Sequence, residues 1–304
     1  MTLEQPSPAK VNFLLNILGR RPDGFHEVET LLHPVPLYDQ LELTRTGSDI
    51  ELTSSNSSLP VDASNLVHRA ATAFFTAAHI TDGVKIHLVK NIPLAAGLGG
   101  GSSNAANTLL GLNLLFDQPL KEDRLVELAA SLGSDVPFFL QSKPALAVGR
   151  GERIIPLEFF PALTSAWIIL IHPGFGVSTP WAYNQLTGFP EALHGRPGRA
   201  QKLADDLSCD DLAIGAHGFY NALEAPVLRK YPLLSLFQEF LRAHGAIATL
   251  MSGSGSSTFA LAAERAVAER LLAQFKEQFG PTHWTACLRL GIGERSRANS
   301  DRPR

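Results

Sequence analysis

Apolar residues follow both strand-like and helix-like periods along the chain. Residues 84–88 alternate apolar and polar side chains, which is typical of a half-buried strand. Residues 65–78 and 122–132 keep their apolar side chains on one helical face, and Gly133 ends the second helix. Strands and helices mix without strict alternation, so the pattern favours an α+β fold. The other predicted elements are strands at 11–18, 166–171, 246–251 and 283–290, and helices at 179–186, 210–230, 232–243 and 261–279.

Segments rich in glycine, proline and serine divide the chain. Residues 44–62 read as a strand-and-turn region, and residues 188–199 as a long surface loop. A change in character near residue 155 predicts two domains, at 1–155 and 156–293. The polar, aperiodic residues 294–304 predict a disordered tail.

Bulk composition argues against several classes of protein. Hydrophobic residues make up 45% of the 304 residues and charged residues 18%, which is enough apolar material for a sizeable core. The net charge of −3, without a basic stripe, argues against a nucleic-acid partner. The chain has two cysteines, no run of 18 apolar residues and no signal-peptide pattern at its start. We therefore expect a cytoplasmic protein without a membrane partner.

A glycine-serine loop follows the strand at 84–88 and leads into an apolar helix. Its core reads Gly97-Leu98-Gly99-Gly100-Gly101-Ser102-Ser103-Asn104. Glycines let the backbone approach a ligand, and free N–H groups at a helix start favour an anion. Ser102, Ser103 and Asn104 add donors and candidate N-caps. The loop therefore predicts a phosphate-binding site.

Two common phosphate loops do not fit this segment. No Gly-Lys-Ser or Gly-Lys-Thr occurs, so it is not a Walker A loop. Ser102 stands where a dinucleotide fingerprint needs its third glycine, which disfavours a Rossmann dehydrogenase.

Three polar side chains stand out elsewhere. Lys10 opens an apolar strand, where a lysine is ordinarily a snorkelling edge residue. His26 follows a Pro-Asp-Gly turn, and Thr30 rules out a HExxH zinc helix. Asp135 precedes Val-Pro-Phe-Phe, so it is either a turn carboxylate or a charge in a dry pocket that needs a cation. Lys10 is a candidate for that cation.

A second glycine-serine segment lies near the C-terminus. Residues 252–257 read Ser-Gly-Ser-Gly-Ser-Ser between two apolar strands. Flexible linkers are not bracketed by core strands, so we expect a second backbone loop that faces the first.

Together these blocks resemble the GHMP kinases, a superfamily of small-molecule kinases. The resemblance rests on Pro8-Ala9-Lys10-Val11-Asn12, Pro22-Asp23-Gly24-Phe25-His26, residues 97–106, Gly133-Ser134-Asp135-Val136-Pro137 and residues 251–255. It implies two lobes: a domain like the second domain of ribosomal protein S5, which binds ATP, and a ferredoxin-like C-terminal domain, which binds substrate. The first and second blocks are similar to the branch that uses ATP and Mg²⁺ to phosphorylate the 2-hydroxyl of 4-diphosphocytidyl-2-C-methyl-D-erythritol, in the non-mevalonate isoprenoid pathway.

The resemblance also implies roles for individual residues. Lys10 and Asp135 match the catalytic pair. Phe25 falls where an aromatic ring stacks on cytosine, although relatives often carry tyrosine there. Ser103 is a candidate ligand of Mg²⁺. The implied ATP-binding residues are Asn65, Pro93, Ala95, Ala96, Gly97, Leu98, Gly99, Gly100, Gly101, Ser102 and Ser103, and the implied substrate-binding residues are Asn12, Phe25, His26, Phe175, Thr179 and Tyr183.

Two other functions remain open at this point. A homoserine or mevalonate-type kinase would share the fold, but its substrate has no cytosine for Phe25 and His26 to bind. A non-catalytic nucleotide-binding regulator would be expected to lose Lys10 or Asp135, and both are present.

Overall fold

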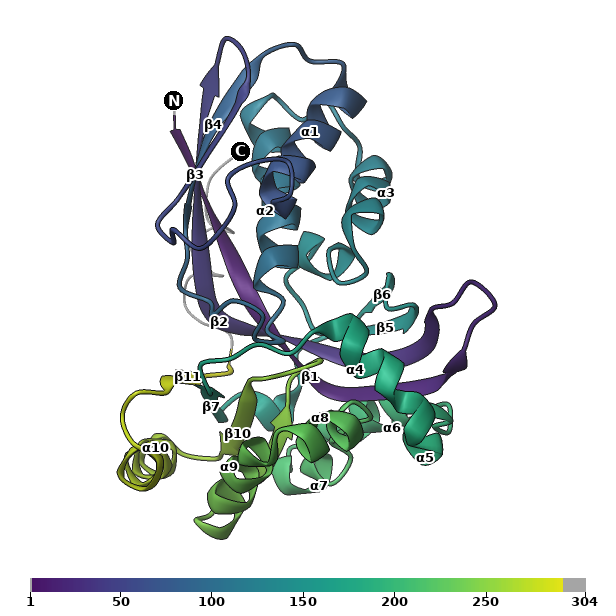
Figure 1. Cartoon of the computed structure of the whole chain (residues 1–304), viewed down its shortest axis with the longest axis vertical. Coiled ribbons are helices and arrows are strands. Elements are labelled where there is room, and N and C mark those ends of the chain that lie inside the picture. Colours follow the sequence, from purple (N-terminus) through teal and green to yellow (C-terminus); the bar gives the residue numbers. More distant parts are fainter. Residues whose placement is uncertain (1, 292–304) are drawn as a thin grey trace.

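The computed structural model describes residues 2–291 and contains a mixed seven-stranded sheet, built mainly from the first half of the chain (Figure 1). Its strand order is β3-β4-β2-β1-β8, and β5 pairs with β2 on one side and β6 on the other. The strands are β1 Thr2–Arg20, β2 His26–Thr46, β3 Ile50–Ser54, β4 Gly83–Val89, β5 Ala145–Gly149, β6 Arg153–Pro156 and β8 Tyr220–Asn221.

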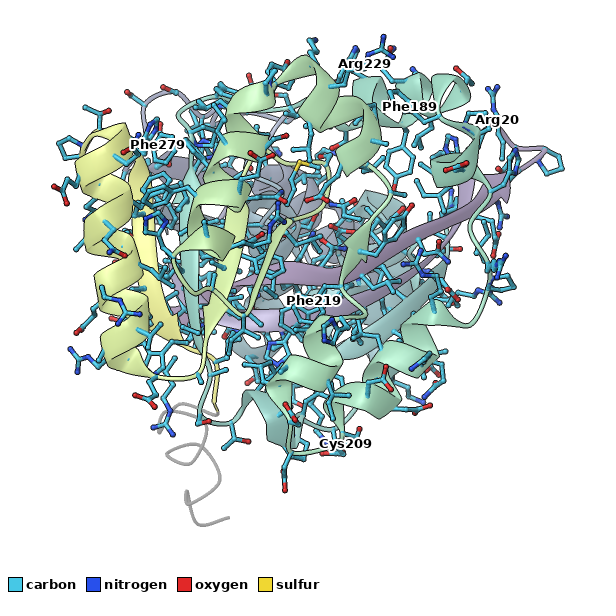
Figure 2. The ribbon with its side chains drawn as sticks, turned by 90° about the horizontal axis from the view of Figure 1, so that it is seen from below. Arg20, Phe189, Cys209, Phe219, Arg229 and Phe279 are labelled. Carbon is cyan, nitrogen blue, oxygen red and sulfur yellow. The ribbon has the colours of Figure 1, made fainter. Side chains whose placement is uncertain are left out.

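The long antiparallel hairpin of β1 and β2 runs through the whole molecule. Strand β1 is longer than the predicted strand at 11–18, because residues 2–10 also pair with β2. Pro6 and Pro8 fit there because they lie in a strand segment whose described pairing is with β2 alone. Figure 2 shows Arg20 at the tip of this hairpin, far from Phe279 at the opposite side.

Three helices cover one face of the first sheet. They are α1 Leu66–Ala78, α2 Gly100–Leu115 and α3 Glu122–Leu132 (Figure 1). Helix α2 packs on β1 and β2, α1 contacts α2 and β3, and α3 packs on α1 and α2, in one apolar cluster. Asn65 caps α1 by accepting a hydrogen bond from the main-chain nitrogen of Val67. The helices predicted at 65–78 and 122–132 are confirmed.

The second sheet has four antiparallel strands in the order β11-β7-β10-β9. Its strands are β7 Trp167–His172, β9 Ala248–Met251, β10 Thr258–Ala262 and β11 Trp284–Arg289, and helices α9 Pro232–Ala243 and α10 Arg265–Phe279 separate them in the chain. This β-α-β-β-α-β sequence is the ferredoxin-like arrangement. The predicted α+β class and the ferredoxin-like C-terminal part are confirmed.

The helix predicted at 210–230 is wrong. That segment divides into α7 Leu212–Ala216, the short strand β8, and α8 Glu224–Lys230. Gly218 interrupts the helical pattern, and β8 gains parallel pairing with Leu14 and Leu15 of β1, which local periodicity does not reveal. The helix predicted at 261–279 begins at Arg265, because residues 261–262 end β10.

The segment predicted as a surface loop at 188–199 contains α5 Pro190–Leu193 and leads into α6 Arg199–Leu207, a helix that periodicity missed. The buried carboxylate of Glu29 holds it, accepting hydrogen bonds from the main-chain nitrogens of Gly198 and Arg199 at 2.8 Å each. A negatively charged carboxylate at the start of a helix also interacts favourably with the positive end of the helix dipole. The remaining helices are α4 Thr179–Gln185 and the 3₁₀ turns Pro137–Leu140, Pro161–Leu163 and Leu186–Gly188. The tail predicted at 294–304 lies outside the described residues.

Side chains from both sheets form a common core. Phe13 of β1 stacks on Phe219 at 4.8 Å and meets Phe259 of β10 edge-on at 5.8 Å between ring centroids. Figure 2 shows Phe219 near the middle of the molecule. Within residues 2–291, no helix is long and apolar enough to cross a membrane.

Candidate active site

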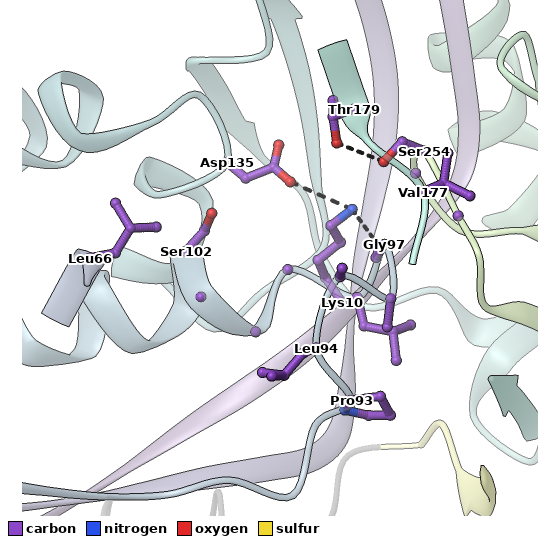
Figure 3. A pocket seen from close by; sticks show the side chains of 18 of the residues that line it. Lys10, Leu66, Pro93, Leu94, Gly97, Ser102, Asp135, Val177, Thr179 and Ser254 are labelled. Carbon is purple, nitrogen blue, oxygen red and sulfur yellow. Dashed lines mark hydrogen bonds and ion pairs between the residues drawn. The ribbon is translucent and has the colours of Figure 1, made fainter. Parts of the chain in front are cut away.

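A pocket of about 530 Å³ opens between the glycine loop, β1 and α4 (Figure 3). Both halves of the chain contribute to it. Among the residues with implied roles, its wall contains Lys10, Asn12, Asn65, Pro93, Ala95, Ala96, Gly97, Leu98, Gly99, Gly100, Gly101, Ser102, Asp135, Thr179 and Tyr183.

The glycine loop has the backbone shape that its composition predicts. Gly97 and Gly99 have φ angles of 75° and 72°, in the left-handed region that favours glycine. Gly99 is the N-cap of α2, so the predicted serine and asparagine caps are wrong: Ser102, Ser103 and Asn104 lie inside the helix. The first main-chain N–H groups of a helix have no partner within it. In α2 these belong to Gly100, Gly101 and Ser102, which line the pocket and suit an anion.

Ser103 does not belong to the pocket wall. Its hydroxyl is fully buried and accepts a hydrogen bond from Ser7 of β1 at 2.9 Å. The side chain therefore faces the sheet, which removes the reason for considering it as a ligand of Mg²⁺. Ser102, one residue earlier, lines the pocket.

A buried carboxylate fixes both ends of the glycine loop. Asp39 of β2 accepts hydrogen bonds from the main-chain nitrogens of Asn91 and Ile92, at 2.7 and 2.9 Å, and from the side chain of Asn104 in α2, at 2.9 Å. It also forms an ion pair with Lys90. Burial lowers the pKa of Lys90, and the charge of Asp39 opposes that shift.

Lys10 lies at the centre of the pocket with its side chain 3% exposed. Its ammonium donates hydrogen bonds to Asn12 Oδ1 at 2.6 Å and to the carbonyl oxygen of Gly97 at 3.0 Å. The same nitrogen lies 3.6 Å from Asp135 Oδ2 (Figure 3). The ion pair that the sequence left open between Lys10 and Asp135 is therefore present.

Asp135 is more accessible than a dry pocket would allow. It follows α3 and Gly133, and the apolar residues after it turn away into the core, where Val136 and Phe138 are buried. Its carboxylate remains 43% exposed and faces the pocket. The interpretation as a desolvated charge is wrong, whereas a carboxylate that can reach a substrate hydroxyl fits.

The second glycine loop contacts the first, as the sequence predicts. The hydroxyl of Ser252 donates to the carbonyl oxygen of Gly97 at 3.0 Å, and the main-chain nitrogen of Ser257 donates to that of Ala96 at 3.1 Å. A Cβ atom on Gly97 would lie 2.0 Å from the carbonyl oxygen of Ser252, so glycine is required at this contact.

The far end of the pocket is formed by α4 and the second loop. Thr179 and Ser254 share a hydrogen bond of 2.7 Å (Figure 3). Tyr183 of α4 lies against His26, with 5.1 Å between ring centroids. Burial raises the pKa of Tyr183, and the charge of Asp135 adds to the shift. Burial, and then the charge of Arg20, lowers the pKa of His26 below its ordinary value.

Three aromatic residues with implied roles lie outside the wall: Phe25, His26 and Phe175. Phe25 is 52% exposed, at the turn between β1 and β2, and contacts Arg150, which lines the pocket. His26 reaches the wall only through its contact with Tyr183. Phe175 packs on Tyr231, with 5.0 Å between ring centroids.

Several wall or support residues gave no usable signal in the sequence. Asp39 holds the glycine loop from β2, and the side chain of Asn221 in β8 donates hydrogen bonds to carbonyl oxygens of the second loop. Both act on residues distant in the chain, and a lone Asp or Asn carries no local pattern. Lys90 could have been found, because it stands between the strand at 84–88 and the glycine loop. Arg150 follows Gly149 in a turn and reads as an ordinary exposed arginine.

Comparison with known proteins defines the family. The profile of the GHMP kinases N terminal domain matches residues 65–143, and that of the GHMP kinases C terminal domain matches residues 190–281. A 4-diphosphocytidyl-2-C-methyl-D-erythritol kinase from Geobacter sp. (strain M21) is 39% identical over 282 residues, which cover 91% of this chain and 96% of the relative. One from Syntrophus aciditrophicus (strain SB) is 42% identical over 257 residues, or 84% and 88% of the two chains. The chain belongs to the GHMP kinases.

Solved structures agree with this family. A crystal structure of 4-(cytidine 5'-diphospho)-2C-methyl-D-erythritol kinase matches with a TM-score of 0.79 at 36% identity, over 96% of this chain and 100% of the other. Homoserine kinase from Cytophaga hutchinsonii matches with a TM-score of 0.73 at 20% identity, over 94% and 93%. The second match is evidence for the GHMP kinase fold alone.

Proposed function

We propose that this GHMP kinase transfers the γ-phosphoryl group of ATP to the 2-hydroxyl of 4-diphosphocytidyl-2-C-methyl-D-erythritol. The observation that carries the proposal is the ion pair of Lys10 and Asp135 beside the glycine loop, in a single pocket. Relatives of that name, aligned over most of both chains, support the choice of substrate. The product would enter the non-mevalonate isoprenoid pathway.

In this proposal, Lys10 and Asp135 share the chemical work. Phosphoryl transfer depends mainly on positioning and on charge stabilisation. Asp135 accepts the proton of the attacking hydroxyl, because its exposed carboxylate faces the pocket. Lys10 is held in place by Asn12 and Gly97, and its ammonium stabilises negative charge on the transferred group.

ATP would lie along the glycine loop. Main-chain nitrogens of the first turn of α2 suit its phosphates, and Asn65 and Pro93 line the part of the pocket available to its nucleoside. Within residues 2–291, no three His, Cys, Asp or Glu side chains cluster as a metal site. This suits Mg²⁺, which binds through phosphates with few protein ligands. Ser102 and Asp135 are the side chains that would hold it, and it would neutralise phosphate charge.

The cytidine part would lie towards Tyr183 and His26. Tyr183 lines the pocket, and its ring packs on that of His26. In this proposal, Tyr183 offers the base an aromatic surface and His26 a polar imidazole edge. Phe25 would cover the base from the hairpin turn. Asn12 and Thr179 would contact the polar groups between the base and the hydroxyl, and Phe175 would support this end from behind.

The division into an ATP-binding, catalytic region at 1–155 and a substrate-binding region at 156–293 also remains our proposal. Lys10, Asp135 and the glycine loop come from the first region, whereas Thr179 and Tyr183 come from the second. We also retain the cytoplasm as the predicted compartment.

A coupled assay of ADP release tests the proposed function. The protein is supplied with ATP, Mg²⁺ and one acceptor at a time: the cytidine-diphosphate compound, mevalonate or homoserine. We expect turnover only with the cytidine-diphosphate compound, and a new phosphate monoester in the ³¹P NMR spectrum of the product. Turnover with mevalonate or homoserine alone would contradict the choice of substrate and leave the kinase assignment intact.

A further inference from the structure

Three cationic side chains line the pocket within the described part of the chain: Lys10, Lys90 and Arg150. All three are paired with carboxylates. Lys10 lies 3.6 Å from Asp135, and Lys90 forms a buried ion pair with Asp39. Arg150 also has a carboxylate partner, because Glu152 Oε2 lies 3.8 Å from its Nε atom. It differs in its hydrogen bonds: the ammonium groups of Lys10 and Lys90 both donate to protein oxygens, whereas the Arg150 guanidinium donates to no side chain or carbonyl within the described residues. The guanidinium therefore keeps donors for a ligand.

The turn between β5 and β6 holds Arg150 in place. Its main-chain nitrogen donates to Glu152 Oε2 at 2.7 Å, and Gly149 and Gly151 have φ angles of 78° and 103°. The guanidinium lies over the ring of Phe25, with 4.9 Å between its central carbon and the ring centroid. Stacking on an aromatic face orients the planar donor group.

The position of Arg150 matches the substrate end of the pocket. The guanidinium lies over Phe25, and the next residue, His26, packs on Tyr183 of α4. Asn65 and Pro93 also line the pocket, and the proposed function assigns them to ATP. The proposed substrate brings a diphosphate group to this end. Lys10 is already shared between Asp135, Asn12 and the glycine loop.

We propose that Arg150 is a specificity-determining residue that binds the diphosphate of the cytidine-diphosphate substrate. This inference rests on the proposed function. The guanidinium fork suits two phosphate oxygens, and its stacking on Phe25 reduces the conformational freedom lost on binding. Arg150 therefore makes the site prefer cytidine compounds that carry phosphates over cytidine itself.

Calorimetric titration of cytidine, CMP and CDP tests this role. The experiment uses the full chain saturated with a non-hydrolysable ATP analogue, so that CDP cannot occupy the ATP end. For R150Q we expect CDP to bind about 10–100-fold more weakly, the effect of losing a hydrogen bond to a charged group. Cytidine should bind as it does to the wild type. The affinity of R150K for CDP should lie between those of the wild type and R150Q, because lysine keeps the positive charge but cannot form the two parallel hydrogen bonds of a guanidinium.

Arg153 provides a matched control. It lies in the same hairpin, its side chain is 67% exposed, and it does not line the pocket. R153Q removes the same charge and should leave CDP binding within about twofold, as expected for a solvent-exposed charge. E152Q should strengthen CDP binding, because it removes the carboxylate that competes for Arg150.

The outcomes separate this inference from the proposed function. Equal losses for cytidine and CDP in R150Q would overturn it, because Arg150 would then act on the base through Phe25. Equal losses of CDP affinity in R150Q and R153Q would also overturn the inference, because the effect of Arg150 would then be that of any nearby positive charge. A wild type that turns over the cytidine-diphosphate compound without preferring CDP to cytidine would overturn the inference alone. If R150Q loses ATP binding as well, its fold is damaged, and R150K is then the variant that tests the inference. An unchanged preference of R150K for CDP over cytidine would overturn the proposed two-point contact of the guanidinium with the diphosphate.

Discussion

Asn221 donates a hydrogen bond of 2.8 Å from its side-chain nitrogen to the carbonyl oxygen of Gly253. The same nitrogen donates to the carbonyl oxygen of Met251 at 2.7 Å, and Asn221 Oδ1 accepts from the main-chain nitrogen of Leu223 at 2.9 Å. Because β8 pairs with Leu14 and Leu15 of β1, one buried side chain connects the strand that carries Lys10 to the second glycine loop.

Asn221→Ala should therefore lower both stability and ATP affinity. It leaves two buried carbonyl oxygens without a donor, at about 1–3 kcal/mol each. Urea denaturation measures the loss, with Asn184→Ala on the exposed side of α4 as control, where we expect a change within about 0.5 kcal/mol. An unfolding midpoint unchanged by Asn221→Ala would show that the second loop does not depend on this side chain.

Asp135→Asn should nearly abolish turnover and leave ATP binding largely intact. Loss of a general base typically reduces the rate by about 10²–10⁴-fold. Steady-state kinetics and ATP titration measure the two effects separately, and Asp82→Asn on the surface serves as the control. Turnover within threefold of the wild type would rule out the catalytic role of Asp135.

Gly99→Val should weaken ATP far more than the cytidine substrate. The added Cβ would lie 2.7 Å from the Phe139 ring and 3.0 Å from Cγ of Lys10, and φ at this position is 72°. A β-branched residue resists that backbone conformation. Calorimetry with each ligand measures the difference. Gly47→Val is the matched control, because nothing lies within 4 Å of its Cβ position. If ATP affinity is unchanged, the loop does not bind phosphate.

Phe25→Ala should lose about 1–3 kcal/mol of substrate binding, the range for stacking of a base on an aromatic ring. Phe25→Tyr should cost little, because the ring face remains. His26→Ala should weaken the same ligand by removing a polar contact. ATP affinity should change little in all three variants, since ATP lies at the other end of the pocket. Wild-type affinity for the substrate in Phe25→Ala would show that the ring does not stack on the base.

His33→Phe should flatten the dependence of stability on pH. Burial lowers the pKa of His33 to about 4, against an opposing hydrogen bond to the carbonyl oxygen of Pro34. Below about pH 6.5, His33 binds a proton in the unfolded chain but not in the folded protein, which favours unfolding. The free energy of unfolding therefore keeps its full value above that pH and falls as the pH drops towards 4. Between pH 7.5 and pH 5, the wild type should lose about 2 kcal/mol more than the variant. Parallel urea curves at both pH values measure this, and equal losses would contradict the assignment.

Local patterns in the sequence predicted the parts of the site that depend on local chemistry. The glycine loop, Lys10 and Asp135 carry their signals in neighbouring residues, and strand alternation and helical faces gave most of the elements. What could not be predicted depends on contacts between distant segments. Asp39 holds the glycine loop across the sheet, and β8 is a strand only because β1 is beside it. The exposure of Asp135 also depends on how the turn after α3 meets the pocket.

Because the hairpin of β1 and β2 packs against elements from both halves of the chain, the protein should not divide into two fragments that fold independently. A cut between residues 155 and 156 would separate Phe13 from Phe259 and leave Glu29 without the start of α6. The apolar cluster around Phe13 draws residues from both sides of that cut. Neither fragment would bury its half of this cluster alone, so the two pieces should fold only when mixed, and the intact chain should melt in one cooperative step.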